Sequence, residues 1–131
     1  MATSVTPFLM FDGSAEQAMQ LYITLFHNSE IKRIERYGPG EQGTEGSVRR
    51  ADFTVAGQEL ICIDSPIKHA FGFTPSFSLF VECENEGELD SAFRQLSHDG
   101  AVLMPPDNYG WSKKFVWVSD RFGVSWQLNL L

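Results

Sequence analysis

The fold is decided by the stretch Asp120-Arg121-Phe122-Gly123-Val124-Ser125-Trp126-Gln127-Leu128-Asn129, near the end of the sequence. Its first four residues predict a tight turn, with Gly123 where a positive φ is tolerated. The next six alternate between apolar and polar side chains, which predicts a strand with one apolar and one polar face. The polar face either meets water or lines a cavity, and this choice governs the functional question.

The composition is that of an acidic globular domain. The 131 residues are 43% hydrophobic and 21% charged, with a net charge of −7. Phosphate-backbone binding needs a concentrated positive surface, so we expect no nucleic-acid partner. Neither a membrane-spanning run nor a secretory signal is visible, and Cys62 and Cys83 lie in strand-like runs, typical of reduced thiols. We therefore expect a cytoplasmic protein without membrane association.

The first half of the sequence predicts a strand, a helix and three more strands. An apolar run over 5–11 ends at the turn signal Asp12-Gly13, and Ser14 with Gln17 forms a capping box before a helical apolar stripe. The glycine-rich stretch 38–46 contains G-x-G-x-x-G, but a strand pattern follows it, so it predicts a loop and not a dinucleotide site. Later strands are expected over 30–37, 48–56 and 58–64.

The second half repeats this order after a linker over 67–73. A strand pattern begins at Ser76, Asn85 with Glu88 forms a second capping pair, and Gly100 stands where the next helix should end. We therefore predict an α+β fold made by internal duplication, with two βαβββ modules in a single domain over 1–131. The modules are expected over about 1–66 and 74–131, with further strands over 101–104, 114–118 and 124–129.

One helix for each sheet covers only one face of that sheet. We expect the two sheets to join into a concave mixed sheet whose inner face is free of helices. Polar groups that converge inside an apolar-walled cleft are typical of a small-molecule site. The side chains expected on the inner face are Pro7, Leu9, Phe11, Ser76, Ser78, Glu82, Ser125, Gln127 and Asn129.

Four motifs carry a family likeness: Pro-Phe-Leu-Met-Phe-Asp-Gly at 7–13, Ala-Glu-Gln-Ala-Met at 15–19, Ser-Phe-Ser-Leu-Phe-Val at 76–81, and 120–127 quoted above. With them the chain resembles the PhnB-like branch of the vicinal oxygen chelate superfamily, which includes glyoxalase I, extradiol dioxygenases and bleomycin-resistance proteins. The resemblance implies a glyoxalase/bleomycin-resistance-like fold and a label of demethylubiquinone methyltransferase. We do not expect that activity, because the usual doubly wound methyltransferase needs a parallel sheet and a glycine-rich loop that opens a helix.

The resemblance also indicates where a metal would bind. Metal enzymes of the superfamily carry ligands on four strands, and those positions fall on Pro7, Cys62 or Asp64, Ser76, and Gln127. Proline has no ligating side chain and serine rarely ligates, whereas a divalent catalytic centre needs about three good protein ligands. We therefore expect no metal and no other cofactor.

Gln127 is the strongest candidate for ligand binding. The alternation of its strand places its side chain on the inner face, and the resemblance places it at a ligand position of the superfamily. A buried glutamine needs partners, which a ligand, a water or Ser78 would supply. Trp111 could close over a ligand and Lys113 could meet an anionic group. Alternatively, Trp111 rests against the sheet or a partner subunit and Lys113 is solvated.

Proton transfer, if the protein is an enzyme, would use Asp64, Glu82 or Cys62. Alternatively, Cys62 is a small buried hydrophobe, the interpretation that its strand favours, and Asp64 is a residue that caps a turn. Three functions thus stay open. The first is a homodimer that binds an unidentified small organic molecule in the cleft without a catalytic metal. The second is a small-molecule lyase, isomerase or oxygenase-type enzyme, and the third is an interaction protein with a vestigial site.

Overall fold

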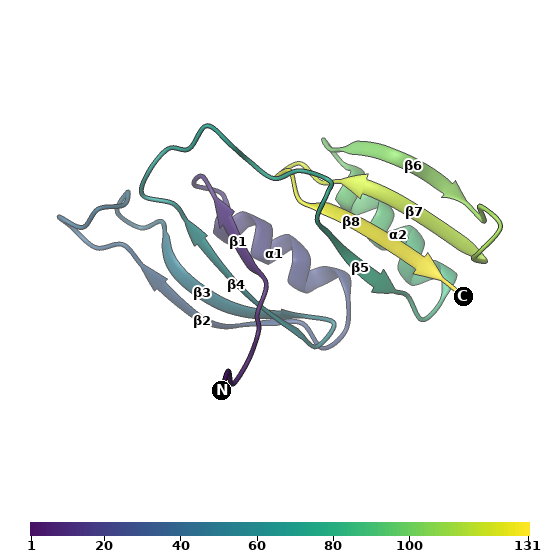
Figure 1. The fold of residues 1–131 in the computed structure, drawn as a ribbon, viewed down its shortest axis with the longest axis horizontal. Coiled ribbons are helices and arrows are strands. Elements are labelled where there is room, and N and C mark those ends of the chain that lie inside the picture. Colours follow the sequence, from purple (N-terminus) through teal and green to yellow (C-terminus); the bar gives the residue numbers. More distant parts are fainter. The chain divides into compact units, whose positions relative to one another are not determined.

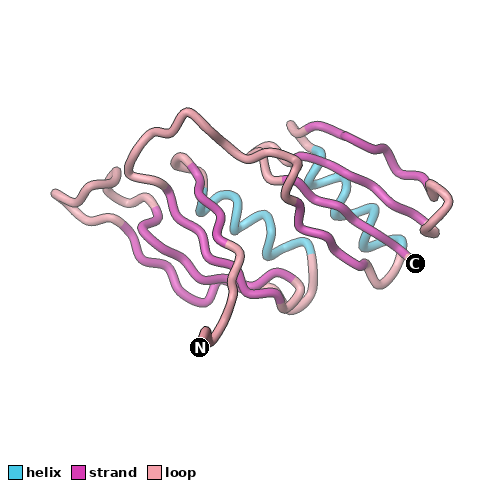
Figure 2. Tube along the Cα trace, in the orientation of Figure 1, coloured by secondary structure: helices cyan, strands magenta, loops and turns pink.

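A computed structural model describes residues 1–131 and divides into two compact units, Met1–Ala70 and Phe71–Leu131. Each unit contains a strand, a helix and three strands (Figures 1 and 2). The elements of the first unit are β1 (Phe8–Phe11), α1 (Ala15–Leu25), β2 (Glu30–Arg36), β3 (Val48–Val55) and β4 (Gln58–Asp64). Those of the second are β5 (Ser78–Glu82), α2 (Glu86–Ser97), β6 (Ala101–Asp107), β7 (Lys114–Ser119) and β8 (Ser125–Leu130).

The two units have the same sheet topology. The strand orders are β1-β4-β3-β2 and β5-β8-β7-β6, so each module builds its own four-stranded sheet. In each sheet the first strand pairs in parallel with the last strand of its module, and the other pairs are antiparallel. The predicted α+β fold from two βαβββ modules is confirmed.

Several strand boundaries differ from those that the sequence indicates. Strand β5 begins at Ser78, so Ser76 lies before it and outside the sheet. Strand β6 continues through Pro105 and Pro106, which it tolerates because it forms an edge of its sheet. Gly123 has a φ of +93°, as the turn ahead of β8 requires.

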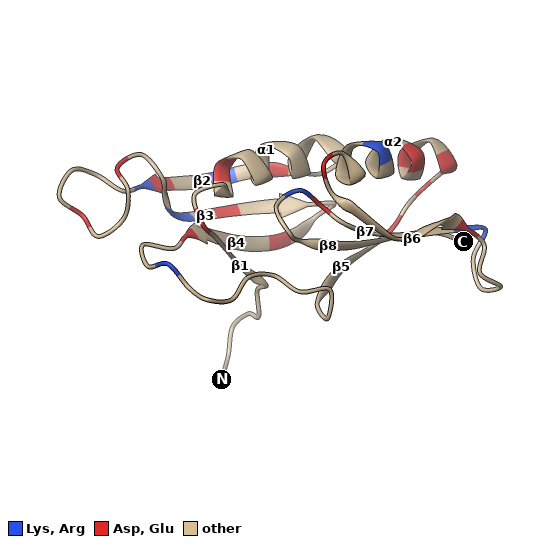
Figure 3. Cartoon of the chain, turned by 90° about the horizontal axis from the view of Figure 1, so that it is seen from above, with Lys and Arg blue, Asp and Glu red and all other residues tan.

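Each helix covers one face of the sheet in its own unit (Figure 3). Helix α1 buries Ala18, Met19 and Tyr22, and α2 buries Leu89, Ala92 and Leu96. Alternate residues of the strands turn toward these helices, and they make up most of the core. They include Leu9, Phe11, Ala51, Phe53, Leu60 and Cys62 in the first unit, and Val116, Val118, Trp126 and Leu128 in the second. We call the opposite face of each sheet its helix-free face. Neither helix is long and apolar enough to cross a membrane.

The two helices begin in different ways. Asn85 caps α2 as predicted, because its side chain accepts a hydrogen bond from the backbone N–H of Glu88 at 2.9 Å. The capping box predicted at Ser14 is wrong, since that side chain makes no capping hydrogen bond. Asp64, at the end of β4, takes over this role for α1.

Asp64 joins three segments of the first unit through one carboxylate. Its Oδ1 accepts hydrogen bonds from the backbone N–H groups of Gly13 and Ala15, both at 2.9 Å. Its Oδ2 accepts one from Val48 at 3.0 Å. The residue is only 3% exposed, so these donors have little access to water. The β1–α1 turn, the first residue of α1 and the first residue of β3 are thereby held at the end of β4.

Replacing Asp64 by alanine should destabilise the protein strongly. The change leaves three buried or partly buried N–H groups without an acceptor, so we expect the free energy of unfolding to fall by about 3–5 kcal/mol. Asp64→Asn keeps one acceptor oxygen and should lose less. Urea unfolding followed by far-UV circular dichroism measures both changes. The matched control, D12A, removes an exposed carboxylate from the neighbouring turn and should stay within about 0.5 kcal/mol of the parent. Equal stability of D64A and D12A would contradict this role.

Candidate functional site

The helix-free face of the second sheet is polar along its central strand. In β8, Trp126 and Leu128 face α2 and are fully buried, so Ser125, Gln127 and Asn129 point to the other side. The strand register places Ser78, Phe80 and Glu82 of β5 beside these three residues. The polar face predicted for this strand thus extends across β5 and forms one continuous surface.

Gln127 belongs to a hydrogen-bonded group of four side chains. Its Nε2 donates to Ser78 Oγ at 3.2 Å, and the hydroxyls of Ser78 and Ser125 are 2.7 Å apart. The indole N–H of Trp117 donates to Ser125 Oγ at 2.8 Å. Ser78 is therefore the partner of Gln127, one of the three that we expected. The bond uses the amide nitrogen of Gln127, so its carbonyl oxygen can still accept a hydrogen bond.

A second polar group lies further along the same two strands. Asn129 Nδ2 donates to Glu82 Oε2 at 2.9 Å, and Ser112 Oγ donates to Asn129 Oδ1. Asn129 is buried, whereas Glu82 is exposed. The amide of Asn129 thus fixes one carboxylate oxygen of Glu82 at the rim of the face.

Four aromatic rings cluster beside these polar groups. The ring centroids of Tyr109 and Trp111 are 5.4 Å apart in a stacked arrangement, and both rings meet Phe115 edge-on at 5.9 and 5.5 Å. Phe80 lies 6.3 Å from Phe115. These are the separations at which aromatic pairs attract one another. Trp111 therefore rests against the sheet, yet its side chain stays 59% exposed.

Sequence reasoning missed four members of this surface: Phe80, Ser112, Phe115 and Trp117. The alternation within β5 and β7 contained the signal for Phe80 and Phe115, because the strand register pairs them with Gln127 and Asn129. Ser112 lies in the turn before β7, where no periodic pattern indicates the direction of a side chain.

Three predicted site residues of the first unit lie on the other side of their sheet. Phe11, Cys62 and Asp64 are buried toward α1. The expected place of Phe11 on the inner face is therefore wrong. The reason is that the alternation runs through Leu9 and Phe11 toward the helix, which leaves Phe8 and Met10 on the helix-free face. For Cys62 and Asp64, the structure agrees with the alternatives of a small buried residue and of a residue that caps a turn. The carboxylate of Asp64 also accepts hydrogen bonds from three backbone N–H groups, so it is not available to a substrate.

Two further candidates of the second unit lie outside the polar surface. Ser76 is exposed before β5 and its hydroxyl is 2.6 Å from that of Thr74. Lys113 is exposed, and its backbone N–H donates to the carbonyl of Leu130 at 2.9 Å. The neighbouring Lys114 turns to the helix side, where its Nζ is 2.7 Å from Asp90 of α2.

Both cysteines are held as neutral thiols. Burial raises the pKa of Cys62 to about 12, and the carboxylates of Asp64 and Asp52 add to the rise. Burial likewise raises the pKa of Cys83 to about 12, together with Glu88. The thiolate is the nucleophile and the metal ligand, so neither residue is suited to either role near neutral pH.

The positions matched to the superfamily's metal ligands do not fit a divalent ion. Asp64 and Cys62 face the helix side, and the chain has no group of three or more His, Cys, Asp or Glu side chains arranged to hold a metal. Ser76 lies outside the sheet, and serine rarely binds a metal. The amide nitrogen of Gln127 donates a hydrogen bond to Ser78. The chemistry that the face offers is hydrogen bonding, aromatic contact and one carboxylate.

Comparisons with known proteins agree with this architecture. The sequence profile of the family described as 3-demethylubiquinone-9 3-methyltransferase matches residues 3–129. The structure of a Bacillus cereus protein described as a 3-demethylubiquinone-9 3-methyltransferase, PhnB protein, is 53% identical. It covers 98% of this chain and 100% of its own, with a TM-score of 0.95. Protein YjdN of Escherichia coli (strain K12) is 21% identical over 97% of this chain and 95% of its own length.

A more distant structure has the same fold. The fosfomycin resistance protein FosX of Listeria monocytogenes, complexed with Mn(II) and 1S,2S-dihydroxypropylphosphonic acid, matches with a TM-score of 0.65. The match covers 98% of this chain and 93% of that chain at 11% identity. At this identity the likeness concerns the fold alone.

The native protein should resist thiol reagents. At about pH 8, Ellman's reagent should react with neither cysteine, because a pKa of about 12 leaves almost no thiolate. Unfolding in urea should release two reactive thiols per chain. For the same reason, the folded state should lose stability as the pH rises from about 9, where unfolded thiols ionise, toward 12. One full equivalent of rapid labelling in the native state would contradict this assignment.

Proposed function

The chain belongs to the 3-demethylubiquinone-9 3-methyltransferase family, the PhnB-like branch of the vicinal oxygen chelate superfamily; within it, we propose that this protein binds a small organic molecule. The proposed site is the helix-free face of the second sheet. Binding uses hydrogen bonds and aromatic contact, and it requires no catalytic metal. The observation that carries the proposal is the hydrogen-bonded group around Gln127 beside the cluster of Phe80, Tyr109, Trp111 and Phe115.

The polar group around Gln127 and the aromatic cluster complement each other in binding such a molecule. The carbonyl oxygen of Gln127 accepts a hydrogen bond from the ligand, and the exposed ring of Trp111 covers its apolar part. A hydrogen bond contributes about 0.5–1.5 kcal/mol, and an aromatic pair about as much beyond its buried area. One contact of each kind orients a small molecule and holds it weakly, and enclosure of more ligand surface tightens the binding.

The polar side chains are ordered before any ligand arrives. Ser78, Ser125 and Trp117 hold one another through hydrogen bonds, and Asn129 holds Glu82. Tyr109 is fixed by a hydrogen bond from its hydroxyl to the carbonyl of Pro105. Groups that are already in place lose little conformational entropy on binding, so a modest set of contacts suffices.

The methyltransferase in the family description is not part of this proposal. Both sheets are mixed, and the glycine-rich loop 38–46 joins β2 to β3 instead of opening a helix. The usual doubly wound methyltransferase places its cofactor at such a loop, beside a parallel sheet. The fold of this chain offers neither feature.

A proton-transfer enzyme is the second candidate, and Glu82 favours it. Of the three predicted acid or base groups, Glu82 alone lies on the helix-free face, with one oxygen bound by Asn129 and the other available to a substrate. A lyase or isomerase that acts on a small molecule needs one such group. If turnover is found in a substrate screen, Glu82→Gln should abolish it while ligand binding persists.

Benzamide is a suitable probe, because its ring matches the aromatic cluster and its amide matches Gln127. In a ¹H–¹⁵N titration, the indole N–H signals of Trp111 and Trp117 should shift. The indole N–H of Trp126 should not, because it is buried on the helix side and donates to Asp120 at 3.0 Å. W111A and Q127A should each weaken binding about tenfold, the equivalent of one lost contact of roughly 1.4 kcal/mol.

Val102→Ala is the matched control for these variants. It removes an exposed apolar side chain of the same sheet, at a register position beside the helix-facing Val118. It should leave benzamide binding unchanged. Equal affinities of W111A, Q127A and V102A, or a titration that shifts only the Trp126 signal, would overturn the proposed site.

The proposal includes a homodimer. Several large apolar side chains are exposed in the single chain, and association of two chains would remove such surface from water. Sedimentation equilibrium at micromolar concentration should give twice the mass of the 14.7 kDa chain. A monomer at that concentration would contradict the dimer and leave the ligand proposal standing. The exposed side chains include Phe8, Ile67, Phe71, Phe77 and Phe80.

A further inference from the structure

The first unit contains a groove that no predicted site residue lines. Its volume is about 440 Å³, within the range of small-molecule pockets. The floor lies on the helix-free face of the first sheet, where Arg33, Asp52 and Ile61 occupy neighbouring strands in register. Ser4 and Thr6, from the segment before β1, form part of the wall and contribute hydroxyl groups.

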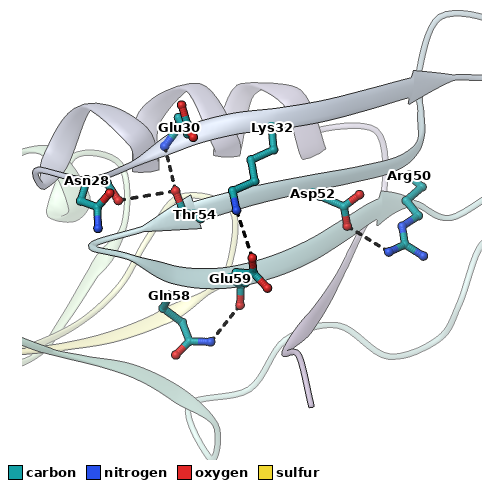
Figure 4. A network of polar contacts seen from close by, with 8 residues as sticks. All are labelled: Asn28, Glu30, Lys32, Arg50, Asp52, Thr54, Gln58 and Glu59. Carbon is teal, nitrogen blue, oxygen red and sulfur yellow. Dashed lines mark hydrogen bonds and ion pairs between the residues drawn. The ribbon is translucent and has the colours of Figure 1, made fainter. Parts of the chain in front are cut away.

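Charged side chains of both signs line this groove (Figure 4). Lys32 Nζ is 3.0 Å from Glu59 Oε1 and forms a separate pair. Asp52 is shared, because Arg50 Nη2 lies 3.0 Å from one of its oxygens and Arg33 Nη2 lies 3.3 Å from the other. The three cations and two carboxylates of the lining sum to one positive charge, whereas the whole chain carries −7. A further carboxylate, Glu35, does not line the groove but lies 3.8 Å from Arg33 Nη2.

The two arginines retain most of their hydrogen-bonding capacity. A guanidinium has five N–H donors in a planar fork, and both Arg33 and Arg50 reach Asp52 through Nη2 alone. Arg33 Nη2 also lies 3.8 Å from Glu35, so the remaining nitrogens of both side chains take part in none of these ion pairs. Both side chains are about half exposed, so these ion pairs are weak and rearrange at little cost. A second carboxylate placed beside Asp52 would engage the donors that Asp52 does not use.

We propose that this groove binds a small organic monoanion through its carboxylate. Arg33 and Arg50 hold the carboxylate, Thr6 donates a hydroxyl hydrogen bond, and Ile61 contacts the apolar part of the molecule. The proposal is independent of the face in the second unit, since it rests on residues of the first unit alone.

The charge of the groove selects a monoanion over a dianion. One carboxylate cancels the single excess positive charge. A phosphate dianion carries a further negative charge that lies close to Asp52 and Glu59, and like charges at this range repel. The groove therefore distinguishes a carboxylate from inorganic phosphate, although both anions suit an arginine fork.

A ¹H–¹⁵N titration with sodium benzoate tests the proposal. At constant ionic strength, the backbone signals of Lys32, Asp52 and Ile61 should shift, with a dissociation constant on the order of 1 mM. Sodium phosphate should shift them less at equal concentration. R50Q should weaken benzoate binding about tenfold, because it removes one charged partner. D52N should strengthen it, because the competing carboxylate is gone.

Arg49→Gln is the matched control. Arg49 precedes Arg50 in the same strand and also forms an ion pair, at 3.0 Å to Glu41, but it does not line the groove. R49Q should bind benzoate like the parent. Equal affinities of R49Q and R50Q, weaker binding by D52N, or preference for phosphate would overturn the proposal. Benzoate shifts confined to the second unit would also overturn it, while supporting the separate site there.

Discussion

The carboxylate of Asp64 is the interaction on which the first module depends. It lies at the end of β4 and accepts hydrogen bonds from the β1–α1 turn, the start of α1 and the start of β3. The first two segments lie 51 and 49 residues from Asp64 in the sequence and the third lies 16 residues from it. Each has a buried or partly buried backbone N–H that would otherwise lack a partner. In the second module, the N-terminus of α2 is capped by Asn85, the residue just before the helix. The duplicated modules therefore share a topology but not the contacts that stabilise it.

One helix for each four-stranded sheet is the constraint that creates the candidate sites. Such a helix buries one face of the sheet and leaves the other for solvent, a ligand or another surface. In the second module the free face carries a hydrogen-bonded polar group beside aromatic rings. In the first it carries ion pairs around a groove. The two modules thus share one architecture but differ in their free faces. The face of the second module carries mainly neutral polar and aromatic contacts, and the face of the first carries mainly ion pairs.

The closing strand shows how far local patterns predict a site. Alternation in β8 placed Trp126 in the core and Gln127 on the opposite face, and the structure confirms both. The same reasoning failed for Leu9 and Phe11, because the first strand is short and its alternation was counted from Pro7, which precedes it. A shift of one residue moves every side chain of a strand to the other face.

The sequence by itself determined the family, the order of the elements, the duplication and the polar face of the last strand. These follow from periodicity, turn residues and motifs, all of which are local properties of the chain. Only the tertiary structure decided that Asp64 caps α1, that Phe80 and Phe115 join Trp111, and that Arg33 and Arg50 share Asp52. Each of these contacts joins segments whose proximity depends on strand register and sheet order, and no local pattern specifies either.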